Sequence, residues 1–261
     1  MPIVGSDQSL SKKRFIQATR KQREGLMSES KQFQVPDQAG VDSLNEAFGS
    51  EAPQAVLRWL AGHGGRAQVP LVSSFGADSV VLLHMIAEID PSYPVLFIDT
   101  GKHFYDTLHY RDQLKEHFGL TNLQAVTPDP DDLKEKDPRG ALWITSQDAC
   151  CDLRKTVPLA RVMRNYSGWI TGRKRFQTND RADLNVFELD GDKMKVNPLA
   201  SWGPKDVAAY IKAHSLPGHP LVPRGYLSIG CAPCTSPVED GEDARAGRWK
   251  GSDKTECGLH I

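Results

Sequence analysis

Residues 69–83 read Val69-Pro70-Leu71-Val72-Ser73-Ser74-Phe75-Gly76-Ala77-Asp78-Ser79-Val80-Val81-Leu82-Leu83. The run before Ser74 is short and apolar, which is typical of a buried strand. The next residues are serines, a glycine and an aspartate, which predict a turn, and the apolar residues after Ser79 predict a helix. A strand, a glycine turn and a helix in this order indicate the beginning of an α/β unit.

The same alternation continues along the chain. We expect further strands at 95–99, 123–126 and 169–172, with helices at 105–118 and 150–163. Two more elements are predicted, a hairpin over 187–196 around Asp190-Gly191-Asp192 and a helix from Pro204 to His214. The predicted fold class is therefore α/β, with an open, mostly parallel sheet flanked by helices and a loop-rich segment from Pro217 onward.

The composition excludes several classes of protein. The 261 residues carry a net charge of −1, which argues against nucleic-acid and membrane-surface binding. No apolar run approaches the ~20 residues that span a bilayer, and the N-terminus lacks the apolar core of a secretory signal. The five cysteines are an odd number, so we expect a reducing, cytoplasmic environment and not a disulfide framework.

The chain also divides by composition. Residues 1–40 are polar and rich in Lys, Gln and Ser, which predicts a flexible N-terminal tail. Residues 41–261 carry the apolar periodicity of one folded domain, and we find no internal repeat and no second core.

The turn after the first strand is a candidate phosphate site, because open α/β sheets bind ligands there. It comprises Ser73, Ser74, Phe75, Gly76, Ala77, Asp78 and Ser79. Free N–H groups at the helix start and the serine hydroxyls would bind phosphate, and the lack of a Walker A sequence disfavours a P-loop NTPase. A serine-rich helix cap without a ligand is the alternative. The stretch resembles the phosphate loop of the adenine-nucleotide α-hydrolase-like superfamily, as does Asp99-Thr100-Gly101 after the second strand.

Four cysteines have the pattern of metal ligands: Cys150, Cys151, Cys231 and Cys234. A Cys-x-x-Cys pair alone is most often half of a zinc site. Adjacent residues on a helix diverge by about 100°, however, so Cys150 and Cys151 would reach one zinc ion only under strain. The separate iron corners of a cubane accept diverging thiolates, so we expect a [4Fe–4S] cluster, with structural zinc or unligated buried thiols as alternatives.

Two further residues are candidates for chemistry. Cys257 lies in a polar, glycine-flanked tail where a thiol would be free to act as a nucleophile. Lys155 follows Cys151 by four residues and would share its helical face, so its ammonium could offset a negative cluster and reach an anionic substrate. A solvated surface lysine is the alternative.

These motifs, in this order, resemble those of one family, the iron–sulfur assimilatory sulfonucleotide reductases known as adenylyl-sulfate (APS) reductases. The shared motifs are the phosphate loop, Asp99-Thr100-Gly101, Cys150-Cys151 with Arg154-Lys155, Cys231 to Cys234, and Glu256-Cys257-Gly258-Leu259-His260. The resemblance covers roughly residues 60–261. Reductases of 3′-phosphoadenylyl sulfate (PAPS) keep the terminal motif but lack the four cluster cysteines.

The resemblance implies an activity and its partners. It implies reduction of adenylyl sulfate (APS) to sulfite and AMP, a [4Fe–4S] cluster, thioredoxin or glutaredoxin as the reductant, and a homo-oligomer. Neither a nucleic acid nor a membrane is an expected partner. Cys257 would be the catalytic nucleophile on a mobile tail, residues 245–261, which carries His260 over the site.

The resemblance also assigns cations to the substrate. Lys155 would lie between cluster and substrate, and the phosphate and sulfate would be bound by Arg181, Arg245 and Arg248. Considered alone, each arginine would be a solvated charge. The chain departs from the family pattern where it has Asp78-Ser79, Lys174-Arg175-Phe176-Gln177 and Trp249-Lys250-Gly251.

The reaction hypothesis is thiol chemistry. The Cys257 thiolate attacks the sulfate sulfur, AMP leaves, and a thiosulfonate remains until an external dithiol releases sulfite. The chain has no sixth cysteine to resolve this intermediate. Three alternatives remain: a PAPS reductase, an ATP-dependent pyrophosphatase-type thiolation enzyme, and a zinc-stabilised nucleic-acid-binding protein.

Overall fold

The computed structural model describes residues 33–252, 254 and 256 of the chain. Its first helices are α2, Gln38–Phe48, and α3, Pro53–Gly62. The Asp37 side chain accepts the Gly40 N–H at 2.9 Å and caps α2, and Pro53 opens α3, where a proline costs no hydrogen bond. Phe33 is buried in the core, so the described fold includes residues before position 41. Residues 1–32 of the predicted tail lie outside the described part.

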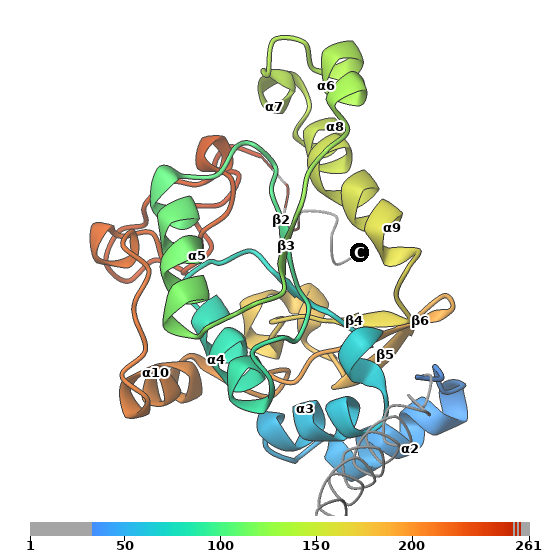
Figure 1. Cartoon of the computed structure of the whole chain (residues 1–261). Helices are drawn as coiled ribbons and strands as arrows, with labels where there is room; N and C mark the ends of the chain where they lie inside the picture. The colour runs from blue at the N-terminus through green and yellow to red at the C-terminus, as the bar shows by residue number, and fades with distance from the viewer. Residues whose placement is uncertain (1–32, 253, 255, 257–261) are drawn as a thin grey trace, which may run out of the picture. The chain divides into compact units, whose positions relative to one another are not determined.

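Among the described residues, six strands form one sheet in the order β3-β2-β1-β4-β6-β5 (Figure 1). Their bounds are β1 Leu71–Ser73, β2 Val95–Ile98, β3 Leu123–Val126, β4 Gly168–Ile170, β5 Phe187–Asp190 and β6 Lys193–Val196. The neighbours are parallel except β5 and β6, which form the predicted hairpin. Its turn uses Gly191 at φ +62°, a conformation that glycine adopts without strain. The predicted α/β class with a mostly parallel sheet is confirmed.

Helices cover both faces of the sheet, and its central strands are therefore buried on both sides. In β2, Val95 and Phe97 point into one core, whereas Leu96 and Ile98 point into another, as strand alternation requires. The larger core packs against α4, Ser79–Ile89, α5, Tyr105–His117, and α10, Pro204–Ala213. The smaller core holds α9, Val157–Met163, on the opposite face (Figure 1).

The connection from β3 to β4 carries the first cysteine pair. It runs through α6, Pro130–Lys136, α7, Leu142–Thr145, and α8, Gln147–Cys151, toward α9. The sequence predicted one regular helix over 150–163, but Asp152–Thr156 form a turn of π-helix, closed by a bond from the Val157 N–H to the Asp152 carbonyl. Pro158 offers the physical reason, because its ring would clash with the carbonyl four residues earlier in an α-helix and it has no N–H to donate.

The segment after α10 is irregular, as its prolines and glycines predicted. Short 3-10 turns occur at Val222–Arg224 and Ala232–Cys234. The Ala232 N–H bonds the Lys102 carbonyl at 2.7 Å, so the second cysteine pair is held against the loop that follows β2. None of the described helices combines the length and the apolar character that crossing a membrane requires.

Candidate functional site

The candidate site is a pocket at the carboxyl ends of β1 and β4. The strand order reverses here, because β1 pairs with β2 on one side and with β4 on the other. The loops that follow the two strands, 73–79 and 172–177, line a pocket of about 250 Å³. Open α/β sheets bind their ligands in the crevice at such a reversal, so the topology itself indicates a binding site.

The predicted phosphate loop forms one wall of this pocket. Six of its seven residues line it: Ser73, Ser74, Gly76, Ala77, Asp78 and Ser79. Phe75 does not, because its ring is buried in the core and meets Phe97 edge to face at 5.5 Å. Phe75 has φ +52°, and Ser73 Oγ accepts its N–H at 3.2 Å. A left-handed backbone is costly for a residue with a side chain, so burial of the ring stabilises the sharp turn of the loop.

An ion pair ties the facing wall to the phosphate loop. Lys174 Nζ lies 2.9 Å from Asp78 Oδ2 and 3.2 Å from the Gly172 carbonyl, and all three residues line the pocket. The Lys174 side chain is only 2% exposed, so its ammonium depends on these two acceptors. Asp78 and Lys174 lie in two of the stretches where the sequence departs from the family pattern. The ion pair between them was not predicted.

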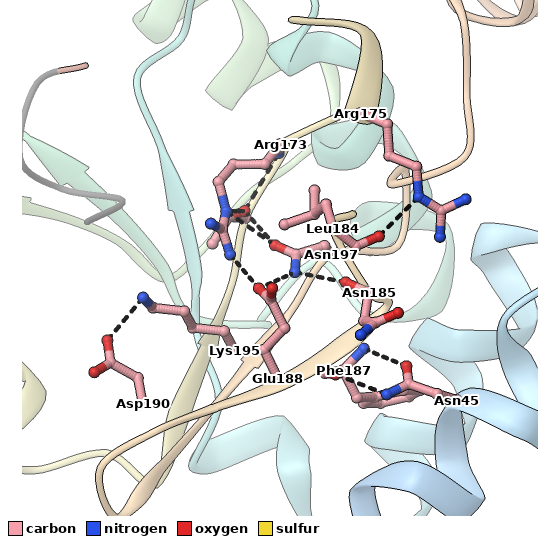
Figure 2. A network of polar contacts seen from close by, with 11 residues as sticks. Asn45, Arg173, Arg175, Leu184, Asn185, Phe187, Glu188, Asp190, Lys195 and Asn197 are labelled. Carbon is pink, nitrogen blue, oxygen red and sulfur yellow. Dashed lines mark hydrogen bonds and ion pairs between the residues drawn. The ribbon is translucent and has the colours of Figure 1, made fainter. Parts of the chain in front are cut away.

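A polar network centred on Arg173 supports this wall (Figure 2). Arg173 Nε donates to Asn197 Oδ1 at 3.2 Å, and Arg173 Nη2 donates to Glu188 Oε2 at 2.5 Å. The buried Asn197 amide donates to the same Glu188 oxygen and to the Asn185 carbonyl, both at 2.8 Å. The network joins the loop after β4 to the β5–β6 hairpin. Because its members satisfy one another, it stiffens the wall and neutralises the Arg173 charge.

The cations expected to bind substrate meet at this pocket: Lys155, Arg181, Arg245 and Arg248 line it. Lys155 is buried on the π-helical turn. The Arg248 guanidinium carbon lies 4.3 Å from the centre of the Trp249 ring, and a methyl group added at Gly230 would fall 2.4 Å from Arg248 Nη2. Cations opposite a loop of helix-start N–H groups suit a ligand with more than one anionic group.

Of the four predicted cluster ligands, Cys150, Cys151, Cys231 and Cys234, it is Cys231 that lines the same pocket. All four are free of disulfides, and Cys234 is the least buried. Burial raises the pKa of Cys150 to about 11, and the charges of Cys151, Cys231 and Cys234 contribute to that rise. Among the described residues, no three His, Cys, Asp or Glu side chains form a group that could hold a metal ion.

The turn Asp99-Thr100-Gly101 contacts the cysteines as well as the pocket. Only Thr100 of the three lines the pocket. Its hydroxyl lies 3.3 Å from Cys231 Sγ, and its carbonyl accepts Arg154 Nη1 at 2.9 Å. Arg154 Nη2 lies 2.6 Å from Asp137 Oδ2, with both side chains buried. Arg154, which the sequence alone did not identify as a partner of this turn, therefore joins the cysteine-bearing helix to it.

His103 is a residue of the site that sequence reasoning missed, although its place shortly after a strand end was a signal. It lines the pocket, and its Nε2 lies 2.9 Å from the Ile98 carbonyl. Burial lowers the pKa of His103, so the ring is neutral at pH 7 and we assign its proton to Nε2. Within the described part of the chain Nδ1 has no hydrogen-bond partner, so this atom can accept a hydrogen bond from a ligand.

Two predicted site residues, Cys257 and His260, lie outside the described residues. The residue before the predicted nucleophile, Glu256, is described and lines the pocket. Its Oε1 lies 2.7 Å from Arg181 Nη2. The chain therefore reaches the pocket immediately before Cys257.

Known proteins are similar to this chain in both sequence and fold. The family model of the phosphoadenosine phosphosulfate reductase domain matches residues 68–237. An adenosine 5′-phosphosulfate reductase of Mesorhizobium japonicum is 53% identical over 223 residues, 85% of this chain and 87% of the relative. A phosphoadenosine 5′-phosphosulfate reductase of Gloeobacter violaceus is 39% identical over 229 residues, 86% of this chain and 95% of the relative.

One solved structure is similar over most of this chain. The phosphoadenylyl-sulfate (PAPS) reductase from Candida auris, in a phosphate complex, has a TM-score of 0.66 at 27% identity. The match covers 78% of this chain and 98% of that chain. It confirms the adenine-nucleotide α-hydrolase-like fold expected from the phosphate loop.

Proposed function

Because this chain belongs to the phosphoadenosine phosphosulfate reductase domain family, we propose that it is an oxidoreductase that reduces adenylyl sulfate to sulfite and AMP in sulfate assimilation. The 53% identity to a protein named for this substrate supports the choice. One geometric observation carries the proposal. The phosphate loop, Lys155 and Cys231 all line one pocket. A nucleotide-binding wall and one residue of the cysteine centre, the name used here for Cys150, Cys151, Cys231 and Cys234, therefore face the same ligand.

The pocket can hold both anionic groups of adenylyl sulfate. The N–H groups at the start of α4 bind the phosphate of the AMP part. Lys155, Arg245 and Arg248 bind the sulfate, since all three line the pocket and charge-assisted hydrogen bonds to anions are strong. When the bond between sulfate and phosphate breaks, negative charge moves onto the phosphate. The fixed N–H groups stabilise that charge without rearranging.

Cys257 supplies the nucleophile in this proposal. Its thiolate attacks the sulfate sulfur and forms an S–S bond, while the S–O bond to the phosphate breaks and AMP leaves with the electron pair. A thiol of thioredoxin or glutaredoxin then attacks Cys257 Sγ, and sulfite leaves. The second thiol of the donor displaces Cys257 and closes the donor's disulfide. Two electrons thus pass from the dithiol to the sulfate sulfur.

The cysteine centre fits a [4Fe–4S] cluster better than a single ion. Its donors are four thiols, and the adjacent side chains of Cys150 and Cys151 diverge, which suits the separate iron corners of a cubane. Cys150, Cys151, Cys231 and Cys234 would hold the cluster. A bound cluster would supply the positive iron charge that keeps these thiols ionised.

The surroundings of the cysteine centre are suited to such a group. The Thr100 hydroxyl, 3.3 Å from Cys231 Sγ, would donate a hydrogen bond to the thiolate. Burial and the Cys231 charge raise the pKa of Cys234, and the Lys155 charge opposes that rise. Lys155 therefore lies close enough to act on both the cysteine centre and the pocket that it lines.

PAPS reduction is the second candidate, because the relatives from Gloeobacter violaceus and Candida auris are named for that substrate. The two substrates differ by one 3′-phosphate. The cysteine pairs favour APS, since the resemblance associates them with APS reductases. The homo-oligomer, the cytoplasmic location and the particular dithiol donor stay predictions.

Sulfite release without oxygen tests the proposed function. APS and PAPS are supplied separately, each with and without thioredoxin. We expect sulfite from APS, and catalytic turnover only with thioredoxin. Comparable release from PAPS would widen the substrate class and keep the chemistry. No sulfite from either substrate, together with ATP-dependent pyrophosphate release, would replace the proposal with the thiolation enzyme.

A further inference from the structure

Trp249 is a buried aromatic residue to which the proposed reaction gives no role. It is 2% exposed and is absent from the described residues that line the pocket. Its φ is +47°, in the left-handed region that is costly for a residue with a bulky side chain. Such a conformation persists only where the surrounding contacts determine it, so Trp249 is held firmly in one place.

Two backbone contacts hold Trp249 beside the second cysteine pair. The Trp249 N–H donates to the Cys234 carbonyl at 3.1 Å. The residue before Trp249 and the residue after Cys234, which are Arg248 and Thr235, form an antiparallel bridge. The stretch that carries Arg248 and Trp249 is therefore fastened to the end of the second cysteine pair.

Three cations lie around the indole ring of Trp249. The guanidinium carbon of Arg248 lies 4.3 Å from the ring centre, and that of Arg245 lies 5.9 Å from it. Lys254 Nζ lies 6.0 Å from the same centre. A cation within about 6 Å of an aromatic ring is attracted by the negative face of the ring, and tryptophan is the strongest partner of this kind. The Trp249 ring is thus a common contact for neighbouring cations.

The two arginines of this group need such a contact. Arg245 and Arg248 line the pocket, so an anionic ligand would meet both. Pocket cations repel one another before a ligand binds: burial lowers the pKa of Arg181, and the positive charge of Arg245 lowers it further. A carboxylate such as Glu256, 3.6 Å from Arg245, offsets the repulsion, but its charge also repels the ligand. An aromatic face attracts cations without a negative charge and without taking up their hydrogen bonds.

We propose that Trp249 is a positioning residue that holds Arg248 and Arg245 where they bind the second anionic group of the ligand. The Trp249 ring acts through the two arginines, and its backbone fixes them to the segment of Cys234. The inference rests on the proposed function in one respect, the identity of that second anionic group as the sulfate of adenylyl sulfate.

A purely structural role makes a different forecast. If Trp249 only fills the core, a smaller side chain lowers stability and weakens the binding of all nucleotides alike. If Trp249 positions the arginines, the loss is confined to nucleotides with a second anionic group. Within the described residues, the buried Trp249 Nε1 has no hydrogen-bond partner, so the proposal assigns the effect to the ring face and not to the N–H group.

The test compares two nucleotides, AMP and ADP, in full-length protein purified without oxygen. ADP carries a second anionic group in the place of the sulfate, and AMP does not. Calorimetry gives both dissociation constants for wild type, Trp249→Leu and Trp249→Phe. We expect Trp249→Leu to bind ADP about tenfold more weakly and AMP within about threefold of wild type. Trp249→Phe should bind both within about threefold, because a phenyl ring also attracts cations.

Trp169→Leu is the matched control. Trp169 is 6% exposed, and Lys195 Nζ lies 5.3 Å from its ring centre. Neither residue is among the described residues that line the pocket. The same substitution should lower the melting temperature at both positions, since each leaves a cavity, but Trp169→Leu should keep the wild-type ratio of ADP to AMP affinity. The number of AMP sites per chain counts the folded protein in each sample.

A second comparison tests whether Trp249 acts through an arginine. Arg248→Met removes the nearest cation from the ring. In that background, Trp249→Leu should weaken ADP binding by a smaller factor than it does in the wild type, because the main group that it positions is gone. An equal factor in the two backgrounds would show that Trp249 acts independently of Arg248 and would contradict the proposal.

The remaining outcomes separate this role from the proposed function. ADP binding of wild-type strength in Trp249→Leu, or an equal loss of AMP and ADP binding, overturns the positioning role. A loss in Trp249→Phe as large as in Trp249→Leu overturns the role of the aromatic face, and the proposal with it. Wild-type protein that prefers ADP through Trp249 but releases no sulfite from APS overturns the reaction and leaves the positioning of the arginines intact.

Discussion

Lys174 and Asp78 join the two loops that make the pocket. Lys174 Nζ lies 2.9 Å from Asp78 Oδ2, although the residues are 96 positions apart in the chain. Lys174 is buried, whereas the Asp78 side chain is 40% exposed, so water screens one end of the pair. The contact connects the phosphate loop after β1 with the loop after β4, where the strand order reverses.

Replacing Lys174 with methionine should loosen this connection. The variant keeps the length of the side chain and removes its charge. Because Asp78 can turn to water, the expected cost is about 1–2 kcal/mol, less than for a fully buried pair. KM for APS should rise several-fold with a smaller change in kcat. Unfolding in denaturant and steady-state kinetics measure the two effects.

Lys134→Met is the control for this variant. Lys134 pairs with Asp131 at 3.0 Å on the surface, where both side chains are exposed. Its loss should change stability by no more than about 0.5 kcal/mol. Equal stability and equal KM in the two variants would refute a role for the Lys174–Asp78 pair.

Replacing Gly230 with alanine should displace the Arg248 side chain and leave the charge of Arg248 in place. The Cβ of Gly230→Ala would lie 2.4 Å from Arg248 Nη2 and 2.6 Å from Cζ, and the end of a flexible arginine can move away. We expect the KM for APS to rise about tenfold, equivalent to ~1.4 kcal/mol, with an unchanged melting temperature. Gly218→Ala, where nothing lies within 4 Å of the new methyl, is the control. An unaltered KM in Gly230→Ala would argue against substrate binding by Arg248.

Iron content should distinguish the cysteine centre from the nucleophile. Cys234→Ser should lose iron and acid-labile sulfide, because a serine hydroxyl is a poor substitute for a soft thiolate ligand. Cys257→Ser should keep both and bind APS, yet form no covalent adduct. Chemical analysis of anaerobically purified protein and intact mass check the two statements. Stoichiometric zinc without sulfide in the wild type would overturn the cluster, and an adduct on Cys257→Ser would overturn the nucleophile.

His219 should make the protein less stable at acid pH. Burial lowers the pKa of His219 from 6.5 to about 4, and the ring contacts Thr107 Oγ1 at 3.1 Å and accepts the Leu221 N–H at 3.2 Å. Because the folded pKa lies below the unfolded one, the unfolded chain takes up the proton first. The neutral His219 ring contributes fully to the free energy of unfolding above about pH 6.5. This contribution is lost as the pH falls toward 4, a change of about 3 kcal/mol.

The free energy of unfolding between pH 7.5 and 4 measures this dependence. His219→Asn keeps an acceptor for Leu221 but has no group that titrates in this range, so its profile should be flatter than that of the wild type. His109→Asn, at an exposed position, should retain the wild-type slope. Parallel profiles for wild type and His219→Asn would show that His219 does not control the acid sensitivity.

Local patterns in the sequence predicted most of the fold. Val95 to Ile98 alternate between two cores, and the glycine of Asp190-Gly191-Asp192 makes the hairpin turn, because both signals come from neighbouring residues. The phosphate loop was predicted for the same reason. Its exception is Phe75, whose aromatic ring packs on Phe97 and is excluded from the pocket, a long-range contact that the loop sequence does not contain.

The supporting contacts of the site could not be predicted in the same way. Arg154 pairs with Asp137, and Arg173 pairs with Glu188, across turns whose geometry depends on the assembled sheet. A charged residue in a sequence is most often solvated, so nothing local marks these pairs as buried. The cysteine pairs were found because their spacing is unusual, whereas the polar residues around them have ordinary spacing.

The π-helical turn at Asp152–Thr156 also has an evolutionary consequence. Removing one residue from this turn would rotate everything before it by about 100° relative to everything after it. Leu159 and Met163 are fixed in the smaller core, so Cys150 and Cys151 would have to swing away from Cys231. Natural variation between the cysteine pair and Pro158 should therefore substitute residues other than Arg154 and Lys155, but never insert or delete one.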